Sequence, residues 1–312
     1  MSKLFALAAL FATFAFSQVT IKPGSTQVDV SIDGKPYTTL FHGPDTTKPY
    51  LHPLRTAQGQ NVSRTYPMGD VAGEKKDHPH HRGLWFSHGD VNGWDFWANE
   101  RNQKGVGKGR GEIVFQKLGK VKSGKKEGSL EAMYQWKDGD GKALLSDDRV
   151  ITFHAGGPNR IVDYQVTLKA LAETKFGDTK EGAFALRLVK ELDEDNTGTM
   201  TSSTGATKEK NIWGKRFPWV DYVGTLDGGK VGIAFLDHPK NPRHPTYWHA
   251  RGYGLFASNI FGVRDFTRDK TKDGAWTLMP GQSATFRFRV VIHPGTTEEA
   301  GIAKLFQEFA AK

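Results

Sequence analysis

Alternation of apolar and polar residues with a period of two recurs from one end of the sequence to the other, and it limits what this chain can fold into. Side chains on a β-strand point to opposite faces in turn, so this pattern predicts strands with one buried face. Turns rich in Gly and Asp follow several such segments, for example at 138–141 and 227–229. The alternating segments include residues 27–32, 129–136, 149–154, 160–168 and 285–292.

The composition favours the same fold class. Glycine occurs 36 times in 312 residues and aromatic residues make up 12%, which suits turns and broad sheets better than a helix bundle. No Pro-rich or Ser-rich linker divides the chain, so we predict one domain over residues 18–312. We expect an all-β, large antiparallel β-sandwich with a short C-terminal helix near 297–310, where an apolar stripe comprises Ile302, Leu305, Phe306 and Phe309.

The N-terminus has the pattern of a cleaved signal peptide. Lys3 precedes an apolar run over 4–16, and small residues precede Gln18 at the positions that signal peptidases require. The run is shorter than the roughly 20 residues that cross a bilayer, and no later stretch approaches that length. We therefore predict that residues 1–17 are removed and that the mature protein is periplasmic or secreted, with no membrane span.

The net charge of +9 does not by itself indicate a nucleic-acid partner. Nucleic-acid binding needs basic residues grouped on one element, and the densest basic run, 117–126, reads as a solvated hairpin. With no cysteine, the chain has no disulfide and no thiolate nucleophile. It also lacks a P-loop, a GxSxG motif, an HExxH motif and a dinucleotide fingerprint after a strand, so no nucleotide cofactor is expected.

Three stretches do not alternate, roughly 42–110, 176–221 and 237–268, and they hold the unusual polar residues. The first includes four histidines in eleven positions: His78, His80, His81 and His88. Imidazole is the usual acid or base near neutral pH and the commonest metal ligand. In an extended segment His78, His80 and His88 would share one face and His81 the other. The alternative is a structural cluster of hydrogen-bonded histidines.

The second polar stretch, 237–251, contains His238, His244 and His249 among three prolines that stiffen the loop. The third is a short charged segment before a strand, with Lys180 and Glu181. Because seven of the eleven histidines lie in 78–88 and 238–251, we expect these two segments to face each other across one concave site, with Glu181 at its rim. Incidental surface histidines are the alternative.

These patterns yield a set of candidate residues. The candidate catalytic residues are His80, His81, Glu181, His244 and His249. The candidate ligand-binding residues are Arg82, Trp85, His88, Asn92, Lys180, Arg187, Trp248 and Arg251, with Trp85 and Trp248 as an apolar wall. A divalent metal is the one cofactor left open, and its ligands would come from His78, His80, His238 and His244.

Four long motifs together resemble the bacterial family called PmoA-like. They are DHPHHRGLWFSHGDVNGWDFW, GDTKEGAFALRL, NIWGKRFPWVDYVG and DHPKNPRHPTYWHARGYGLFASNIFG, and the resemblance covers roughly residues 40–295. It implies a β-sandwich similar to the supersandwich of mutarotase-like and polysaccharide-lyase-like proteins, and a setting in sugar catabolism. It carries no catalytic residue over to this chain.

The sequence leaves three functions open. The first is an exported enzyme that acts on carbohydrate as a lyase, an epimerase or a hydrolase, with His, Arg and Glu side chains as acids, bases and oxyanion partners. The second is a noncatalytic carbohydrate-binding protein, which needs aromatic residues rather than paired histidines. The third is a metalloprotein with histidine ligands, which the methane-oxygenase label of the PmoA-like family would suggest.

Overall fold

The computed structural model describes residues 18–312. The predicted signal peptide, residues 1–17, lies outside the described residues. Within the described chain, no helix has both the length and the apolar character needed to cross a membrane.

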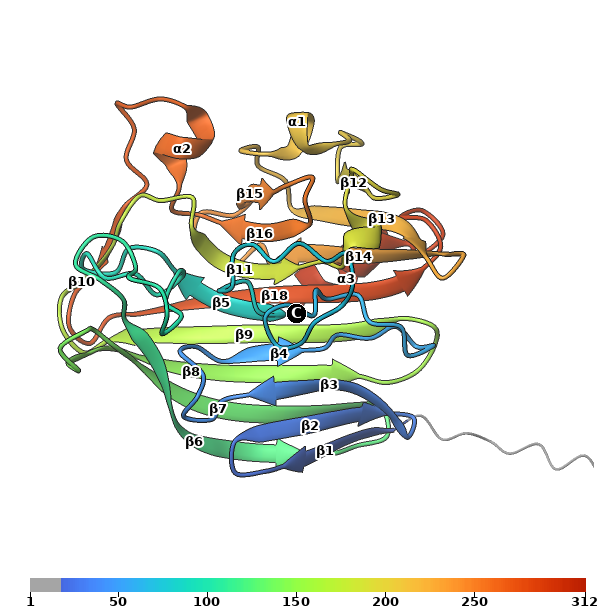
Figure 1. The fold of residues 1–312 in the computed structure, drawn as a ribbon, viewed down its shortest axis with the longest axis horizontal. Helices are drawn as coiled ribbons and strands as arrows, with labels where there is room; N and C mark the ends of the chain where they lie inside the picture. Colours follow the sequence, from blue (N-terminus) through green and yellow to red (C-terminus); the bar gives the residue numbers. More distant parts are fainter. Residues whose placement is uncertain (1–17) are drawn as a thin grey trace, which may run out of the picture.

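Two eight-stranded antiparallel sheets form the body of the molecule (Figure 1). The first sheet has the order β1-β2-β3-β4-β5-β11-β16-β15. Its strands are β1 (Val19–Pro23), β2 (Gln27–Ile32), β3 (Lys35–Phe41), β4 (Tyr50–His52), β5 (Leu84–His88), β11 (Gly182–Arg187), β16 (Leu255–Asn259) and β15 (Tyr247–Ala250). The predicted all-β antiparallel sandwich is therefore confirmed.

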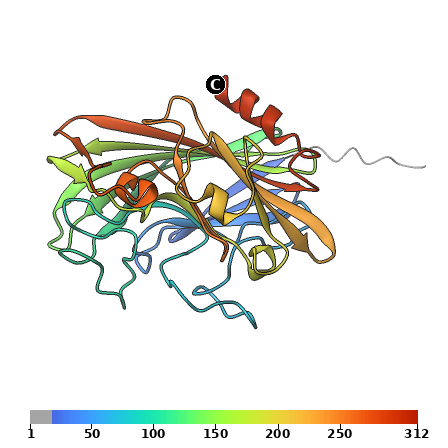
Figure 2. The same cartoon turned by 90° about the horizontal axis from the view of Figure 1, so that it is seen from above.

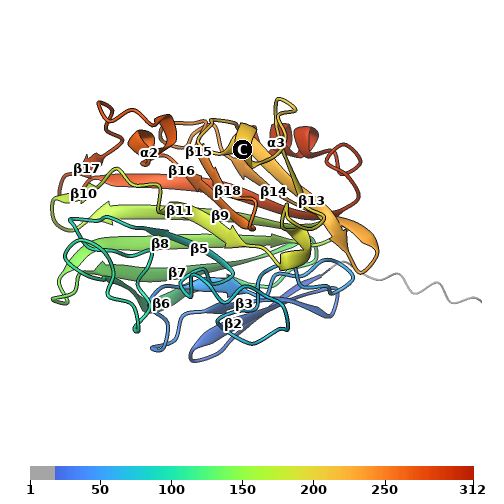
Figure 3. The same cartoon turned by 45° about the horizontal axis from the view of Figure 1, so that its top comes forward.

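The second sheet has the order β12-β13-β14-β18-β9-β8-β7-β6. Its strands are β12 (Thr199–Ser202), β13 (Trp219–Leu226), β14 (Gly229–Asp237), β18 (Ser283–Pro294), β9 (Arg160–Ala170), β8 (Ala143–His154), β7 (Glu127–Lys137) and β6 (Glu112–Lys122). A small two-stranded sheet pairs β10 (Thr174–Phe176) with β17 (Trp276–Leu278), at the left of Figure 3.

The inner faces of the two large sheets share one apolar core, as the alternation predicts. Aromatic rings join the layers: Phe184 of β11 stacks on Phe288 of β18 with 4.4 Å between ring centroids. Phe86 of β5 lies 5.4 Å from Phe286 of β18. β5 and β11 are buried at every position, and β18 is buried over most of its length. Burying side chains of this size supplies most of the stabilisation of such a fold.

The C-terminal helix α3 (Ile302–Ala310) covers the outer face of the second sheet, where Ile302 and Phe309 pack against Trp219 and Leu236. The predicted helix is confirmed but begins later than residue 297. Gly301 has a left-handed φ of 65°, and before it Thr296 and Glu299 form reciprocal hydrogen bonds in a turn. Three short helical segments also occur: η1 (Lys190–Leu192), α1 (Glu209–Ile212) and α2 (Val263–Thr267).

Long loops lie on the opposite side of the molecule from α3, over the first sheet (Figure 2). On the outer face of this sheet, the strand registers place Trp85, Ala185, Ala257 and His249 in one row across β5, β11, β16 and β15. The two central residues of the row are alanines, so only short methyl groups rise from the sheet between the ring of Trp85 and that of His249.

A buried ion pair crosses one strand of the second sheet. His293 of β18 and Asp221 of β13 lie on either side of β14, and the imidazole Nε2 is 3.1 Å from both carboxylate oxygens. The ring passes over Gly232 of β14, where an added Cβ would lie 2.2 Å from it, so glycine is required there. Burial alone would lower the pKa of His293, but hydrogen bonding to Asp221 and its charge outweigh burial and raise it.

This raised pKa predicts the pH dependence of stability. The charged pair stabilises the fold fully below the unfolded histidine pKa of about 6.5, and this contribution is lost as pH rises through the higher folded pKa. Relative to the neutral double variant His293→Gln/Asp221→Asn, the wild-type free energy of unfolding should therefore decline as the pH rises above 6.5. Denaturant unfolding from pH 5 to 9 measures it. A difference that grows with pH would contradict the assignment.

Candidate functional site

A cavity of about 440 Å³ lies on the outer side of the first sheet. It contains residues from all three polar stretches of the sequence, and we call it the histidine cavity. Its lining comprises His78, His80, His81, Asp95, Trp97, Ala98, Val106, Lys180, Glu181, His249, Arg251, Tyr253 and Leu255. The expectation that 78–88 and 238–251 meet at one site with Glu181 is therefore met by His80, His81 and His249.

Strand geometry positions these residues. His81 leads into β5, Glu181 directly precedes β11, and His249 lies on β15, so residues about 170 positions apart in sequence meet over one sheet. Gly83, with φ of 50°, lets the chain after His81 approach β4 closely, because a Cβ there would lie 2.1 Å from the Leu51 carbonyl oxygen. Any side chain at position 83 would push the histidine segment away from the sheet.

His81 is held in one tautomer by a buried arginine. The Arg187 Nη1 group donates to His81 Nδ1 at 3.3 Å, and Asp77 Oδ1 in turn lies 3.2 Å from Arg187 Nη2. Because a guanidinium only donates, Nδ1 accepts and the proton of the neutral ring lies on Nε2. Burial, together with the charges around it, keeps the pKa of His81 well below its usual value, so the ring is neutral at pH 7.

His249 is held in the opposite tautomer. Its Nδ1 group donates to the Lys180 carbonyl oxygen at 2.9 Å, which leaves a lone pair on Nε2. Burial also lowers the pKa of His249, although the charge of Glu181 opposes this. Among the described residues, neither His249 Nε2 nor His81 Nε2 has a hydrogen-bond partner. Two residues that line the cavity thus have an unpaired, buried imidazole nitrogen: an acceptor on His249 and a donor on His81.

His80 adds a second donor. The Gln103 side-chain amide donates to His80 Nδ1 at 3.0 Å, while its oxygen accepts from the Glu100 backbone, which fixes the amide orientation. The His80 proton is therefore on Nε2. Burial, followed by nearby positive charges, lowers the pKa of His80 to about 2, so this ring is also neutral at physiological pH.

Aromatic rings form the walls. Tyr253 stacks on His78 with 5.8 Å between centroids, and Trp97 meets the edge of His81 at 5.8 Å. Trp85, predicted to be a wall, lies beneath His81 and stacks on it at 5.4 Å. It therefore supports the histidine rather than lining the cavity.

Two ion pairs include charged residues that line the cavity. Lys180 pairs with Glu181, and Arg251 Nε lies 2.7 Å from Glu209 Oε1. Asp95 also lines it, but its carboxylate accepts hydrogen bonds from the backbone of Trp97, Ala98 and Val106. Burial raises the pKa of Asp95 in spite of these bonds.

Four candidate ligand-binding residues lie elsewhere. His88 and Trp248 point into the core, because strand alternation places them opposite to Trp85 and His249; His88 packs on Phe261 and Trp248 on Phe256. Arg82 forms a two-point ion pair with Glu100 at 2.7 and 2.9 Å. Asn92, with φ of 54°, bonds to the backbone of Glu173 and Lys175 in a turn. Arg187 does not line the cavity but contacts two residues that do: it donates to His81, and its guanidinium lies over the ring of Tyr253 at 4.6 Å.

His238 and His244 are also outside the histidine cavity. His244 Nδ1 lies 2.7 Å from Asp237, which also accepts from the Thr246 backbone and so organises the proline loop. His238 packs edge-on against Phe309 of α3 at 4.9 Å. The predicted metal set of His78, His80, His238 and His244 therefore does not converge. Within residues 18–312 no group of three or more His, Asp or Glu side chains is arranged to hold a metal.

Tyr253, Asp95 and Trp97 were not among the candidate residues. Asp95 and Trp97 follow the first histidine cluster in a stretch without alternation of apolar and polar residues. The sequence therefore did not show which way their side chains point. Tyr253 lies only two residues after Arg251, so proximity to a candidate was the one available signal.

The fold and the cavity define this chain as a β-sandwich protein with a histidine-rich polar cavity on one outer face. The model of the "Family of unknown function (DUF6807)" matches residues 27–307, so the chain belongs to that family. The match includes every residue that lines the histidine cavity. No curated protein matches the sequence.

Solved structures similar to this chain include sugar-acting proteins at low identity. A galactose mutarotase-like protein from Lactobacillus casei is 12% identical with a TM-score of 0.42, over 88% of this chain and 100% of that one. A galactose 1-epimerase from Lactobacillus acidophilus is 9% identical with a TM-score of 0.39, over 89% and 98%. A GH36 α-galactosidase from Geobacillus stearothermophilus is 12% identical with a TM-score of 0.42; the match covers 89% of this chain and 41% of the galactosidase.

The two tautomers are directly measurable. In ¹⁵N–¹H correlation spectra at pH 7, His81 should show the pattern of a neutral ring protonated at Nε2, and His249 that of a neutral ring protonated at Nδ1. Arg187→Met should remove the preference at His81 and leave His249 unchanged. A charged ring at either position at pH 7, or the same tautomer at both, would contradict the described site.

Proposed function

We propose that this chain is an exported protein that acts on carbohydrate by transferring a proton within the histidine cavity. The observation that carries the proposal is the pair of unpaired Nε2 atoms, an acceptor on His249 and a donor on His81, on two residues that line one cavity with aromatic walls. Buried polar atoms without partners are rare in folded proteins, and a ligand that pairs with both atoms explains them.

In the proposed step, His249 Nε2 takes a proton from a hydroxyl or an acidic C–H group of the sugar. The electron pair left on the sugar moves onto an oxygen, and the Nε2–H groups of His81 and His80 stabilise that oxyanion by hydrogen bonding. The protonated His249 then returns the proton to carbon, as in an epimerase. In a lyase the electron pair instead returns from the oxyanion and breaks the C–O bond on the adjacent carbon, and the departing oxygen takes the proton from His249. A neutral base is required, and the lowered pKa of His249 keeps it neutral at pH 7.

The walls suit a sugar. Trp97 and Tyr253 present rings to the C–H face of a pyranose, while Arg251, Lys180 and the three imidazoles supply donors and acceptors for hydroxyl groups. Hydrolysis of a glycosidic bond usually needs two free carboxyl groups. Here Glu181 pairs with Lys180 and Asp95 is occupied by three backbone amides. Epimerase or lyase chemistry therefore fits the cavity better than hydrolysis.

Export to the periplasm or the exterior is part of the proposal and is supported by the sequence of residues 1–17. The resemblance to the PmoA-like family, with its setting in sugar catabolism, also remains a proposal.

Replacing either imidazole tests the function. His249→Ala and His81→Ala should each reduce turnover by about 10²-fold or more, the usual loss when a positioned acid–base group is removed. The assay is NMR of anomeric exchange over a panel of aldoses, with ultraviolet absorbance of unsaturated products over a panel of polysaccharides. The matched control is His154→Gln, because His154 lies on β8 and pairs with Asp163 outside the cavity. Binding without turnover in the wild type would favour a noncatalytic carbohydrate-binding protein.

The pH profile tests the role of His249. Because its pKa is lowered, kcat/KM should hold to a pH below 6.5 before the acidic limb begins. Glu181 opposes this lowering, so Glu181→Gln should move the acidic limb to still lower pH. Loss of both the activity and the acidic limb in Glu181→Gln would show that Glu181, rather than His249, is the base.

A further inference from the structure

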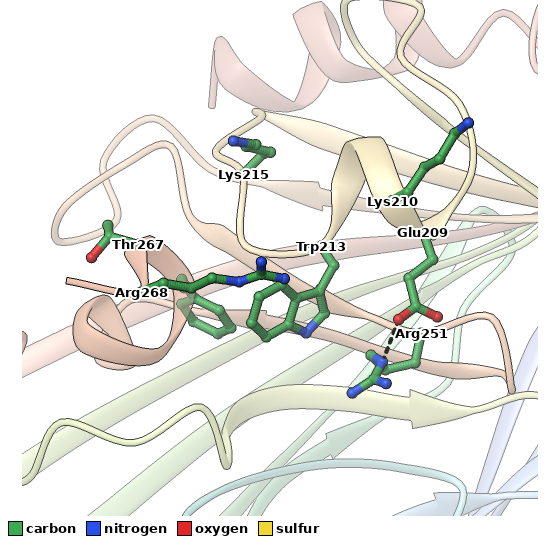
Figure 4. Close-up of a pocket in the computed structure, with 8 residues that line it drawn as sticks. Glu209, Lys210, Trp213, Lys215, Arg251, Thr267 and Arg268 are labelled. Carbon is green, nitrogen blue, oxygen red and sulfur yellow. Dashed lines mark hydrogen bonds and ion pairs between the residues drawn. The ribbon is translucent and has the colours of Figure 1, made fainter. Parts of the chain in front are cut away.

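A second cavity of about 470 Å³ lies beside the histidine cavity (Figure 4). We call it the cationic cavity. Its residues come from the α1 region, β15 and α2: Glu209, Lys210, Trp213, Lys215, Arg251, Phe266, Thr267 and Arg268. None of the candidate residues predicted from the sequence lies here except Arg251.

The two cavities are connected by a shared lining residue and by ring contacts between their walls. Arg251 lines both of them. Trp213 and Phe266 of the cationic cavity meet the ring of His249 edge-on, with 6.3 and 6.1 Å between centroids. Adjacent cavities on one face can hold neighbouring units of a single ligand, whereas a monosaccharide would fill only one of them.

The charge of the cationic cavity is positive. Its one carboxylate, Glu209, already pairs with Arg251 and accepts a hydrogen bond from the Gly252 backbone. Lys210, Lys215 and Arg268 line the cavity and form no ion pair with a carboxylate of residues 18–312. The acidic residues on and next to α2 are engaged elsewhere: Asp265 accepts from the Lys180 backbone and Asp269 from Thr271. Three cations therefore remain for a ligand.

The indole ring of Trp213 forms part of the lining of the cationic cavity. Figure 4 shows its indole between Arg268 and the Glu209–Arg251 pair. The guanidinium carbon of Arg268 lies over this ring, 5.8 Å from the indole centroid. An anionic group of a ligand next to the indole would therefore lie close to a cation. The indole Nε1 group is buried and has no hydrogen-bond partner in the described part of the chain. Together with Lys210 and Lys215, Arg268 gives the lining around this ring a charge that suits an anionic ligand with oxygen acceptors.

We propose that the cationic cavity binds a sugar unit that carries a carboxylate or a sulfate ester, and that the adjoining unit of the same oligosaccharide occupies the histidine cavity. The substrate class is thus an acidic oligosaccharide. This inference rests on the proposed function of the histidine cavity.

Calorimetry with matched charged and neutral probes tests the inference. The first pair is tetragalacturonate and its full methyl ester, and the second is a sulfated carrageenan tetrasaccharide and its desulfated form. At least one charged probe should bind tenfold or more tightly than its neutral counterpart, and salt should weaken that binding. The pair that shows the difference distinguishes a carboxylate from a sulfate ester.

Variants locate the binding. Lys215→Ala/Arg268→Ala should remove the advantage of the charged probe and leave the neutral probe unchanged. The matched control is Lys120→Ala/Lys122→Ala on β6, which removes the same charge from exposed positions away from both cavities. Trp213→Ala should weaken both probes of the pair.

The outcomes separate the two proposals. If neutral probes bind as tightly as charged ones and depend on His249, the cationic cavity is no anion site and only this inference is overturned. If the charged probe is favoured equally in Lys215→Ala/Arg268→Ala and in the control, the site lies elsewhere and the inference is again overturned. If no probe binds to the wild type, the inference fails, and the turnover assay on aldoses and polysaccharides then decides the proposed function separately.

Discussion

The alternation of side chains across β5, β11, β16 and β15 is the constraint on which both the core and the candidate site depend. In each register row, every side chain faces either the second sheet or the outer surface. The row of Trp85, Ala185, Ala257 and His249 faces outward, and its neighbours Phe86, Phe184, Ser258 and Trp248 face the core. A slip of one residue would turn His249 into the core and Trp248 to the outer side, so the packing that stabilises the sandwich also fixes the orientation of His249.

Burial determines the chemistry of the imidazoles. Loss of water lowers the pKa of His80, His81 and His249, and it makes each ring a neutral donor or acceptor instead of a cation. An unpaired buried polar atom costs roughly 1–3 kcal/mol, and His81 and His249 each contain one within the described chain. The large shared core offsets this cost, which a ligand would recover on binding.

The sequence predicted the fold class and part of the site, for different physical reasons. Alternation is a local signal, so the strands and the C-terminal helix could be read directly. The grouping of histidines correctly indicated that His80, His81 and His249 share a site. It misplaced His88 and His244. Clustering along the chain does not show that His88 lies on the core face of its strand, or that His244 is bound to the carboxylate of Asp237 in the proline loop. The cationic cavity joins α1, β15 and α2, and no local pattern could have indicated it.

Arg251 couples the two cavities electrostatically. Its positive charge neutralises Glu209 on one side and, after burial, is among the charges that lower the pKa of His249 on the other. On the proposed substrate class, an anionic group in the cationic cavity would offset part of that positive charge. The pKa of His249 would then rise toward its usual value, and His249 would become a stronger base when the neighbouring unit is in place. Binding energy gained at one unit would in this way favour proton transfer at the next.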